Sequence, residues 1–250
     1  MTAPIRAHYE QLAPLFEYPG PDYPAHVRLA RESLGNRYPV AVAELDAFAR
    51  ALPSETDTFS TEALNDMQEI FTRSFDVQSI TTLGVGYVMF GDDYKRGELL
   101  VNLNREHREA GVDCGTELPD HLPLVLCLLA RWPDPEIVGE FVEEILYPAL
   151  EKMIAEFGPE RMEQRNRLYK KYFKTLITSS EERGTIFRAP LAAVNAVLAE
   201  DFHPSPPQRP ERGSDFLRAV GRELDIEAHE GRPRPRPRPR PRTAPSGRML

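Results

Sequence analysis

Two acidic side chains and a histidine lie close together between residues 117 and 123, where the chain reads Glu-Leu-Pro-Asp-His-Leu-Pro. Carboxylates and an imidazole are typical of metal sites and of acid–base catalysis. The spacing fits neither chemistry, because the sequence has no His-Glu-x-x-His motif, no pair of Glu-x-x-His helices and no Cys–His cluster. A metal site is therefore not predicted from its candidate ligands, which are Glu117, Asp120, His121, His107 and Cys114.

The sequence also gives no support for a catalytic nucleophile or a nucleotide-binding site. The two cysteines, Cys114 and Cys127, lie outside any local signature of a catalytic thiol, and no Gly-x-Ser-x-Gly elbow occurs. The Gly84-Val85-Gly86 turn is too short for a dinucleotide fingerprint, and no Gly-Lys-Ser/Thr follows it. The sequence therefore predicts a protein that is not an enzyme. Two cysteines without a Cys-x-x-Cys pair also favour a reducing, cytosolic setting.

A second polar turn precedes this segment and is bracketed by Gly91 and Gly97. Arg96 follows Asp92 by four positions, a spacing at which a guanidinium and a carboxylate on one helical turn pair. A helix is expected to begin at Glu98. Two interpretations remain open: a local ion pair that fixes the helix start, or direct contact with a ligand.

An intensely apolar stretch follows Pro119 and runs to Ala130, which predicts a buried, central helix with the proline in its first turn. Negative charge is favourable at the amino end of a helix, where Glu117 and Asp120 are expected, with His121 held by a carboxylate. These groups either receive a basic, partly helical peptide or tie loops together inside the fold. The two interpretations are compatible.

Helical spacing of apolar residues extends over most of the chain, and strand-like alternation of useful length is absent. Asp22 is expected to cap a helix that ends at Leu34, and Asp134 with Pro135 marks another start. The pattern predicts an all-α fold, a single compact domain of about 8–10 helices.

Composition changes after His203. We expect a helical domain over residues 1–203, a proline-rich linker with room for one short helix over 204–230, and a disordered Arg-Pro tail over 231–250. The tail is either a solvated low-complexity segment or a basic arm that contacts the acidic body, a partner, or anionic lipid and nucleic acid.

The net charge of −8 hides an asymmetry. Residues 232–250 hold seven of the 31 basic residues and no acidic ones, which leaves 24 basic and 39 acidic residues in the body, a net charge of −15. A body this acidic repels phosphate, so nucleic-acid binding is not expected. A basic protein partner suits it better.

Membrane insertion is not expected either. No apolar run approaches the roughly 18 residues that a spanning helix needs. The first residues also lack the pattern of a secretory signal. We therefore expect a cytoplasmic protein.

The two polar phrases resemble the paired motifs of the NarJ-type family, the delta subunits of respiratory nitrate reductases, which are related to the TorD/DmsD group. The phrase Leu15-Phe16-Glu17-Tyr18-Pro19 also resembles an early motif of this family. The resemblance covers roughly residues 7–202. It implies an all-helical assembly chaperone that binds the amino-terminal segment of an apo molybdoenzyme catalytic subunit, with nitrate reductase as the default client. It also implies no stably bound cofactor; the chaperone assists insertion of molybdopterin guanine dinucleotide, the molybdenum cofactor, into its client and releases it before or during membrane docking.

The resemblance also implies where the client binds. Acidic side chains are expected to meet its basic residues beside an apolar groove, so that Asp120→Ala or Glu117→Ala weakens binding without unfolding the chaperone. His121 stands where many relatives have an aromatic residue, and the Arg-Pro tail lies outside the family pattern. That pattern matches at Asp92, Arg96, Gly97, Glu117, Leu118, Pro119, Asp120, Leu122 and Pro123. The residues expected to bind the client are Tyr87, Asp92, Asp93, Arg96, Glu117, Asp120 and His121.

Two other classes of protein remain as alternatives. A helical adaptor or structural subunit would recruit a basic protein without any maturation role and would stay in the finished complex. A metal-dependent helical hydrolase would hold a metal ion through His121.

Overall fold

The computed structural model describes residues 6–53, 56–172 and 184–204 of the chain. Regular structure in these residues is helical, apart from one isolated antiparallel bridge between Gly84 and His121. Since α8, the π-helical turn η2 and α9 continue into one another, the segments make ten helices, and the predicted all-α fold is confirmed. The elements are α1 (His8–Leu12), η1 (Ala13–Phe16), α2 (Tyr23–Leu34), α3 (Pro39–Ala51), α4 (Thr61–Phe75), α5 (Val85–Phe90), α6 (Tyr94–Glu109), α7 (Leu122–Arg131), α8 (Pro135–Phe141), η2 (Val142–Leu146), α9 (Tyr147–Glu156), α10 (Pro159–Tyr172) and α11 (Arg188–Phe202).

Side-chain caps fix several helix starts. Ser60 accepts a hydrogen bond from the backbone N–H of Ala63, and Asp134 accepts two at the start of α8, as its sequence predicts. Asp22 occupies the position before α2, but its side chain accepts no capping hydrogen bond. Its carboxylate instead lies 3.4 Å from the Nε2 atom of His26, one turn further along. The expected cap at Asp22 is therefore wrong.

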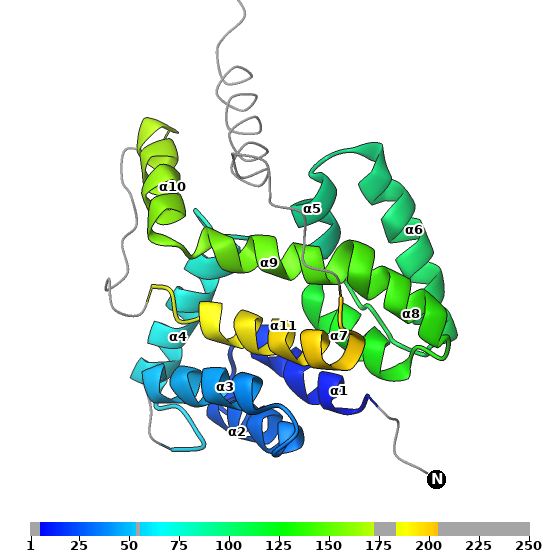
Figure 1. Cartoon of the computed structure of the whole chain (residues 1–250). Helices are drawn as coiled ribbons and strands as arrows, with labels where there is room; N and C mark the ends of the chain where they lie inside the picture. The colour runs from blue at the N-terminus through cyan, green and yellow to red at the C-terminus, as the bar shows by residue number, and fades with distance from the viewer. Residues whose placement is uncertain (1–5, 54–55, 173–183, 205–250) are drawn as a thin grey trace, which may run out of the picture.

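The longest helical run contains a π-helical turn with a local cause. Pro148 has no N–H to donate to the carbonyl of Glu144, and its ring would clash with that carbonyl in a regular α-helix. The wider π turn at Val142–Leu146 lies immediately before it and accommodates the missing bond. The helix therefore passes through Pro148 and crosses the molecule (Figure 1).

The helices pack in layers that Figure 1 shows from one side. Helix α11 packs against α3 on one side and α9 on the other, while α1 packs against α2 and α7. Helices α5 and α6 pack against each other beside the long α8–α9 run. Helix α10 touches α9 and projects from the edge of the bundle.

Helix α7 lies in the core, as its apolar sequence predicts. Val125, Leu126, Leu128 and Leu129 have no exposed surface. Burying a leucine side chain of this kind contributes about 1.5–3 kcal/mol. The expected start was three residues too early: α7 begins at Leu122, because residues 118–121 form a turn in which the His121 N–H donates to the Leu118 carbonyl.

The final helix of the described residues ends next to the expected domain boundary at residue 203. Helix α11 ends at Phe202, and His203 adopts a left-handed conformation with φ of 48° before Pro204. The predicted linker beyond residue 204 and the Arg-Pro tail lie outside the described residues. The division into domains therefore stays a prediction.

Candidate functional site

The two polar motifs meet through a backbone clamp. The Val85 N–H donates to the Asp120 carbonyl and the Leu122 N–H donates to the Leu83 carbonyl, both at 2.9 Å. These bonds flank the bridge between Gly84 and His121. The start of α5 and the start of α7 are therefore held side by side, which places the chain that leads into α6 next to the second motif.

A buried ion pair joins the motifs at this clamp. The Nε atom of Arg96 on α6 donates to Oδ2 of Asp120 at 3.2 Å, and Asp120 is 0% exposed. The Arg96 guanidinium also lies over the ring of Tyr87, 5.1 Å from its centroid, a cation–π arrangement. Of the two interpretations of the Asp92–Arg96 spacing, the local ion pair is wrong, because Arg96 pairs with Asp120 instead.

Gly86 makes room for this ion pair. A Cβ atom at position 86 would lie 2.9 Å from Oδ2 of Asp120, 3.0 Å from Cδ2 of Leu99 and 3.3 Å from Cγ of Arg96. Real Cβ atoms essentially never approach another atom as closely as 2.9 Å. Gly86 therefore allows α5 to pack closely against the ion pair.

His107 contacts the backbone of the second motif. Its Nε2 atom lies 2.9 Å from the Pro119 carbonyl, and the residue is buried. Burial lowers the pKa of His107 below its ordinary value, and this effect outweighs the opposing hydrogen bond to the backbone of Pro119. The neutral imidazole is thus a structural link between α6 and the turn before α7. The sequence indicated His107 only as a candidate metal ligand.

His121 lies half-buried at the entrance to α7. Burial lowers the pKa of its imidazole, although Glu117, Asp120 and Glu17 each act in the opposite direction. Glu17 directly follows η1, which packs against α7. Glu17 was not among the expected site residues, because nothing in its local sequence connects it to a segment about one hundred positions later.

The seven expected site residues fall into two groups. An inner group is formed by the side chains around the Arg96–Asp120 pair: Tyr87, Arg96, Asp120 and His121. An outer group of exposed carboxylates, Asp92, Asp93 and Glu117, lies on the surface. The carboxylate of Asp93 caps α6 through the Lys95 N–H. The outer carboxylates are exposed to a partner, Tyr87, Arg96 and His121 are partly exposed, and Asp120 is fully buried.

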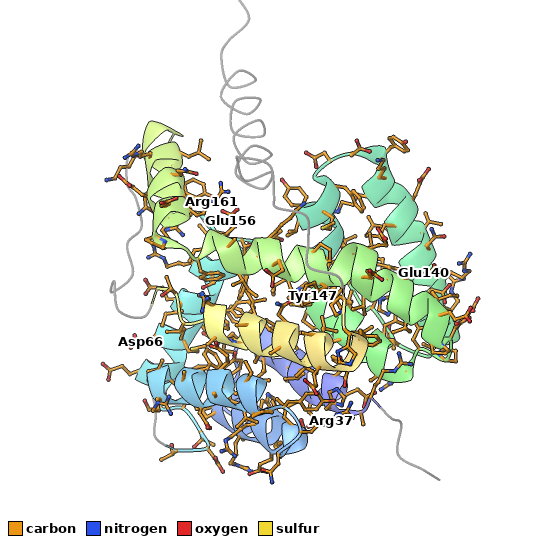
Figure 2. The ribbon with its side chains drawn as sticks, in the orientation of Figure 1. Arg37, Asp66, Glu140, Tyr147, Glu156 and Arg161 are labelled. Carbon is orange, nitrogen blue, oxygen red and sulfur yellow. The ribbon has the colours of Figure 1, made fainter. Side chains whose placement is uncertain are left out.

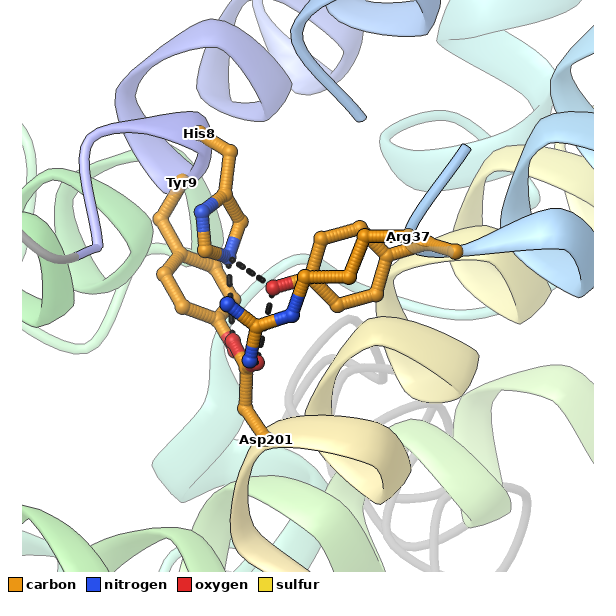
Figure 3. Close-up of polar contacts among 5 residues, drawn as sticks. His8, Tyr9, Arg37 and Asp201 are labelled. Carbon is orange, nitrogen blue, oxygen red and sulfur yellow. Dashed lines mark hydrogen bonds and ion pairs between the residues drawn. The ribbon is translucent and has the colours of Figure 1, made fainter. Parts of the chain in front are cut away.

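A second polar cluster, which the sequence analysis missed, joins helices from both ends of the described chain. Asp201 on α11 accepts hydrogen bonds from the hydroxyls of Tyr9, at 3.0 Å, and Tyr38, at 2.7 Å (Figure 3). The Nε2 atom of His8 and the guanidinium of Arg37 lie 3.0 and 2.7 Å from its carboxylate. Burial alone would raise the pKa of Asp201, but the bonds from His8, Tyr38 and Tyr9 hold it below its usual value.

Among the described residues, His, Cys, Asp and Glu side chains form no group of three or more that is arranged to hold a metal ion. Cys114 and Cys127 are both free, and burial raises the pKa of each thiol. In the same part of the chain, the helices are too short or too polar to cross a membrane.

Comparison with known proteins gives one consistent similarity. No protein-family model matches the chain. The chain is 33% identical over 113 residues to the nitrate reductase molybdenum cofactor assembly chaperone NarJ of Escherichia coli strain K12, and equally to that of strain O157:H7. The match covers 45% of this chain and spans 45% of the length of those relatives. The resemblance to NarJ-type chaperones predicted from the motifs is confirmed by this similarity.

Proposed function

We propose that the chain is a dedicated assembly chaperone for a respiratory molybdoenzyme. It binds the apo catalytic subunit, most simply that of a nitrate reductase, and supports insertion of the molybdenum cofactor in the cytoplasm. The observation that carries this proposal is the 33% identity to NarJ over 113 residues. The chaperone has no catalytic role and keeps no cofactor of its own.

We propose that the client contact is electrostatic where it involves the exposed carboxylates. Asp92, Asp93 and Glu117 are exposed carboxylates, and the body of the chain is strongly acidic. A basic, amphipathic amino-terminal segment of the client complements this surface and becomes ordered as it binds. The buried Arg96–Asp120 pair fixes the starts of α6 and α7, so it positions the acidic surface without touching the client.

Titration calorimetry tests the proposal with purified protein and a synthetic amino-terminal segment of the molybdoenzyme catalytic subunit encoded beside it. We expect binding that weakens as salt is added, because exposed charges are screened. Glu117→Lys should weaken it about tenfold. Glu140→Lys, which makes the same charge change on an exposed residue of α8, should leave affinity unchanged.

A second readout separates a chaperone from a structural subunit. Cells that lack the chaperone should contain catalytic subunit with little molybdenum, and the finished wild-type complex should not contain the chaperone. Stoichiometric retention of the chain in the active complex, with full molybdenum content in its absence, would favour the adaptor alternative.

A further inference from the structure

An open pocket of about 340 Å³ lies between helix α4 and the segment that follows η1. Its walls come from two places in the sequence: Tyr18 on one side, and the outward face of α4 with the residues after it on the other. The lining residues are Tyr18, Asn65, Gln68, Glu69, Thr72, Arg73 and Val77. We call this pocket the α4 groove.

The walls of the α4 groove are fixed by contacts between them. Gln68 donates through Nε2 to the Pro19 carbonyl at 2.8 Å, which ties the segment after η1 to α4. The ring of Tyr18 meets that of Phe71 edge-on, with centroids 5.7 Å apart. At the other end, the Val77 N–H donates to the Thr72 carbonyl at 2.9 Å. The groove is thus a preformed feature, so a ligand that enters it pays little to order its walls.

Two side chains on the rim of the groove are exposed. Tyr18 is 61% exposed and Val77 is 45% exposed. Tyrosine is enriched among the residues that dominate binding energy at protein interfaces, because its rigid ring offers a large contact area and a polar tip. The rim therefore offers an anchor point for an apolar side chain of a partner.

Charge around the groove identifies the kind of partner. Glu62, Asp66 and Glu69 follow one another at helical spacing along α4, and Asp76 ends the helix. The single basic residue of this helix, Arg73, is buried beside Glu69. Glu62, Asp66 and Glu69 are all exposed, and Glu69 lies 3.7 Å from the Arg73 guanidinium. Basic residues at matching spacing on a partner helix would complement this acidic face of α4.

The groove adjoins the candidate site through η1. Element η1 packs against α7, the helix that begins beside the second motif. Exposed Glu17 follows η1 and directly precedes Tyr18, so it carries negative charge between η1 and the groove. By contrast, a pocket of about 490 Å³ between α2 and α3 is lined by Arg28, Arg31 and Arg50 and by one carboxylate, that of Asp57, so its lining is less suited to a basic segment.

We infer that the α4 groove is the seat of a basic amphipathic helix, namely the client segment of the proposed function, on which this inference rests. An apolar side chain of that helix enters between Tyr18 and Val77. Its basic residues face Glu62, Asp66 and Glu69. The candidate site around Glu117 then contacts one end of the segment, and the groove holds the other.

Two variants test the groove, each with a matched control. Thr72→Trp fills the groove, and Ala49→Trp fills the arginine-lined pocket with the same side chain. Asp66→Lys reverses a charge on α4, and Glu140→Lys reverses one on α8, at the opposite edge of the molecule (Figure 2). Binding of the fluorescently labelled client segment is measured by anisotropy, and folding of each variant by circular dichroism and thermal melting.

We expect Thr72→Trp and Asp66→Lys each to weaken binding about tenfold, while both controls bind as the wild type does. If the wild type binds and only Glu117→Lys weakens binding, the groove is not the seat, and the proposed function stands without it. If the wild type binds neither the segment nor the whole apo subunit, the proposed function and the groove assignment both fall.

Discussion

Arg96 and Asp120 form an ion pair across 24 positions of sequence, with 3.2 Å between Nε and Oδ2 and only 1% of the Asp120 side chain exposed. The pair joins the two motifs that carry the resemblance to NarJ-type chaperones. Its burial changes how those motifs are tested. Removing Asp120 affects folding before it affects binding, so Glu117 is the better residue for testing client contact.

Asp120→Ala should lower the free energy of unfolding by about 3 kcal/mol, because it leaves the Arg96 guanidinium without its carboxylate in a largely buried place. Asp92→Ala is the matched control: its carboxylate is exposed, and its loss should change stability by less than about 0.5 kcal/mol. Urea unfolding of both variants measures the difference. Equal losses from the two variants would contradict the assignment of Asp120 as the partner of Arg96.

Gly86→Ala should lower the free energy of unfolding by about 1–2 kcal/mol, because the new methyl group would lie 2.9 Å from the ion-paired Asp120 carboxylate. Gly97→Ala serves as the control, since a Cβ there meets no atom within 4 Å. Alanine is the better helix former, so Gly97→Ala should raise stability by about 0.5–1 kcal/mol. Thermal melting distinguishes the opposite signs, and a Gly86 variant as stable as the wild type would show that the packing there relaxes freely.

Asp201→Ala should lower the free energy of unfolding by about 3 kcal/mol. The hydroxyls of Tyr9 and Tyr38 would lose their hydrogen-bond acceptor, and His8 would lose its carboxylate partner. Arg37 contacts the same carboxylate from the surface and its side chain is 60% exposed. Arg37→Ala should therefore change stability by less than about 1 kcal/mol. Chemical denaturation measures both, and a larger loss from Arg37→Ala than from Asp201→Ala would contradict the role given to Asp201.

Stability should fall as the pH drops below the ordinary histidine pKa of 6.5, in part because of His107. Burial lowers its pKa in the folded protein, so the unfolded chain takes up a proton first and acid favours unfolding. The contribution is fully present above pH 6.5 and is lost as pH falls through the lowered value, with a slope of up to about 1.4 kcal/mol per pH unit.

His107→Gln removes this titration, so the free energy of unfolding of the variant should fall less steeply with acid than that of the wild type. His121, whose pKa is lowered in the same direction, accounts for part of the remaining slope. Leu103→Ala is the control for simple loss of packing in α6, because it should lower stability by a similar amount at every pH. Parallel curves for the wild type and His107→Gln would rule out the contribution of His107.

Local patterns predicted the helices well. The apolar stretch that became α7 is buried as expected, and the cap at Asp134 follows from a carboxylate next to a proline. These features depend on residues within one or two turns of each other, and that is the range over which spacing carries information. Asp22 shows where this reasoning fails. Its carboxylate could cap the start of α2 or pair with His26, and in the structure it lies beside His26.

The interior of the candidate site could not be predicted in this way. Sequence spacing offered Asp92 as the partner of Arg96, whereas the actual partner, Asp120, depends on how α5, α6 and the turn before α7 pack. The Asp201 cluster is harder still, since its members come from α1, the segment before α3 and α11. No local signal relates residues that only the tertiary fold brings together.

The bond between His8 and Asp201 spans 193 positions. A ribosome adds roughly 5–20 residues per second, so about 10–40 s separate the synthesis of these two residues. During that interval the Asp201 cluster cannot form, because α11 has not yet been synthesised. The face of α3 that α11 covers is exposed until then. The helices of the described residues therefore complete their packing only after α11 has left the ribosome.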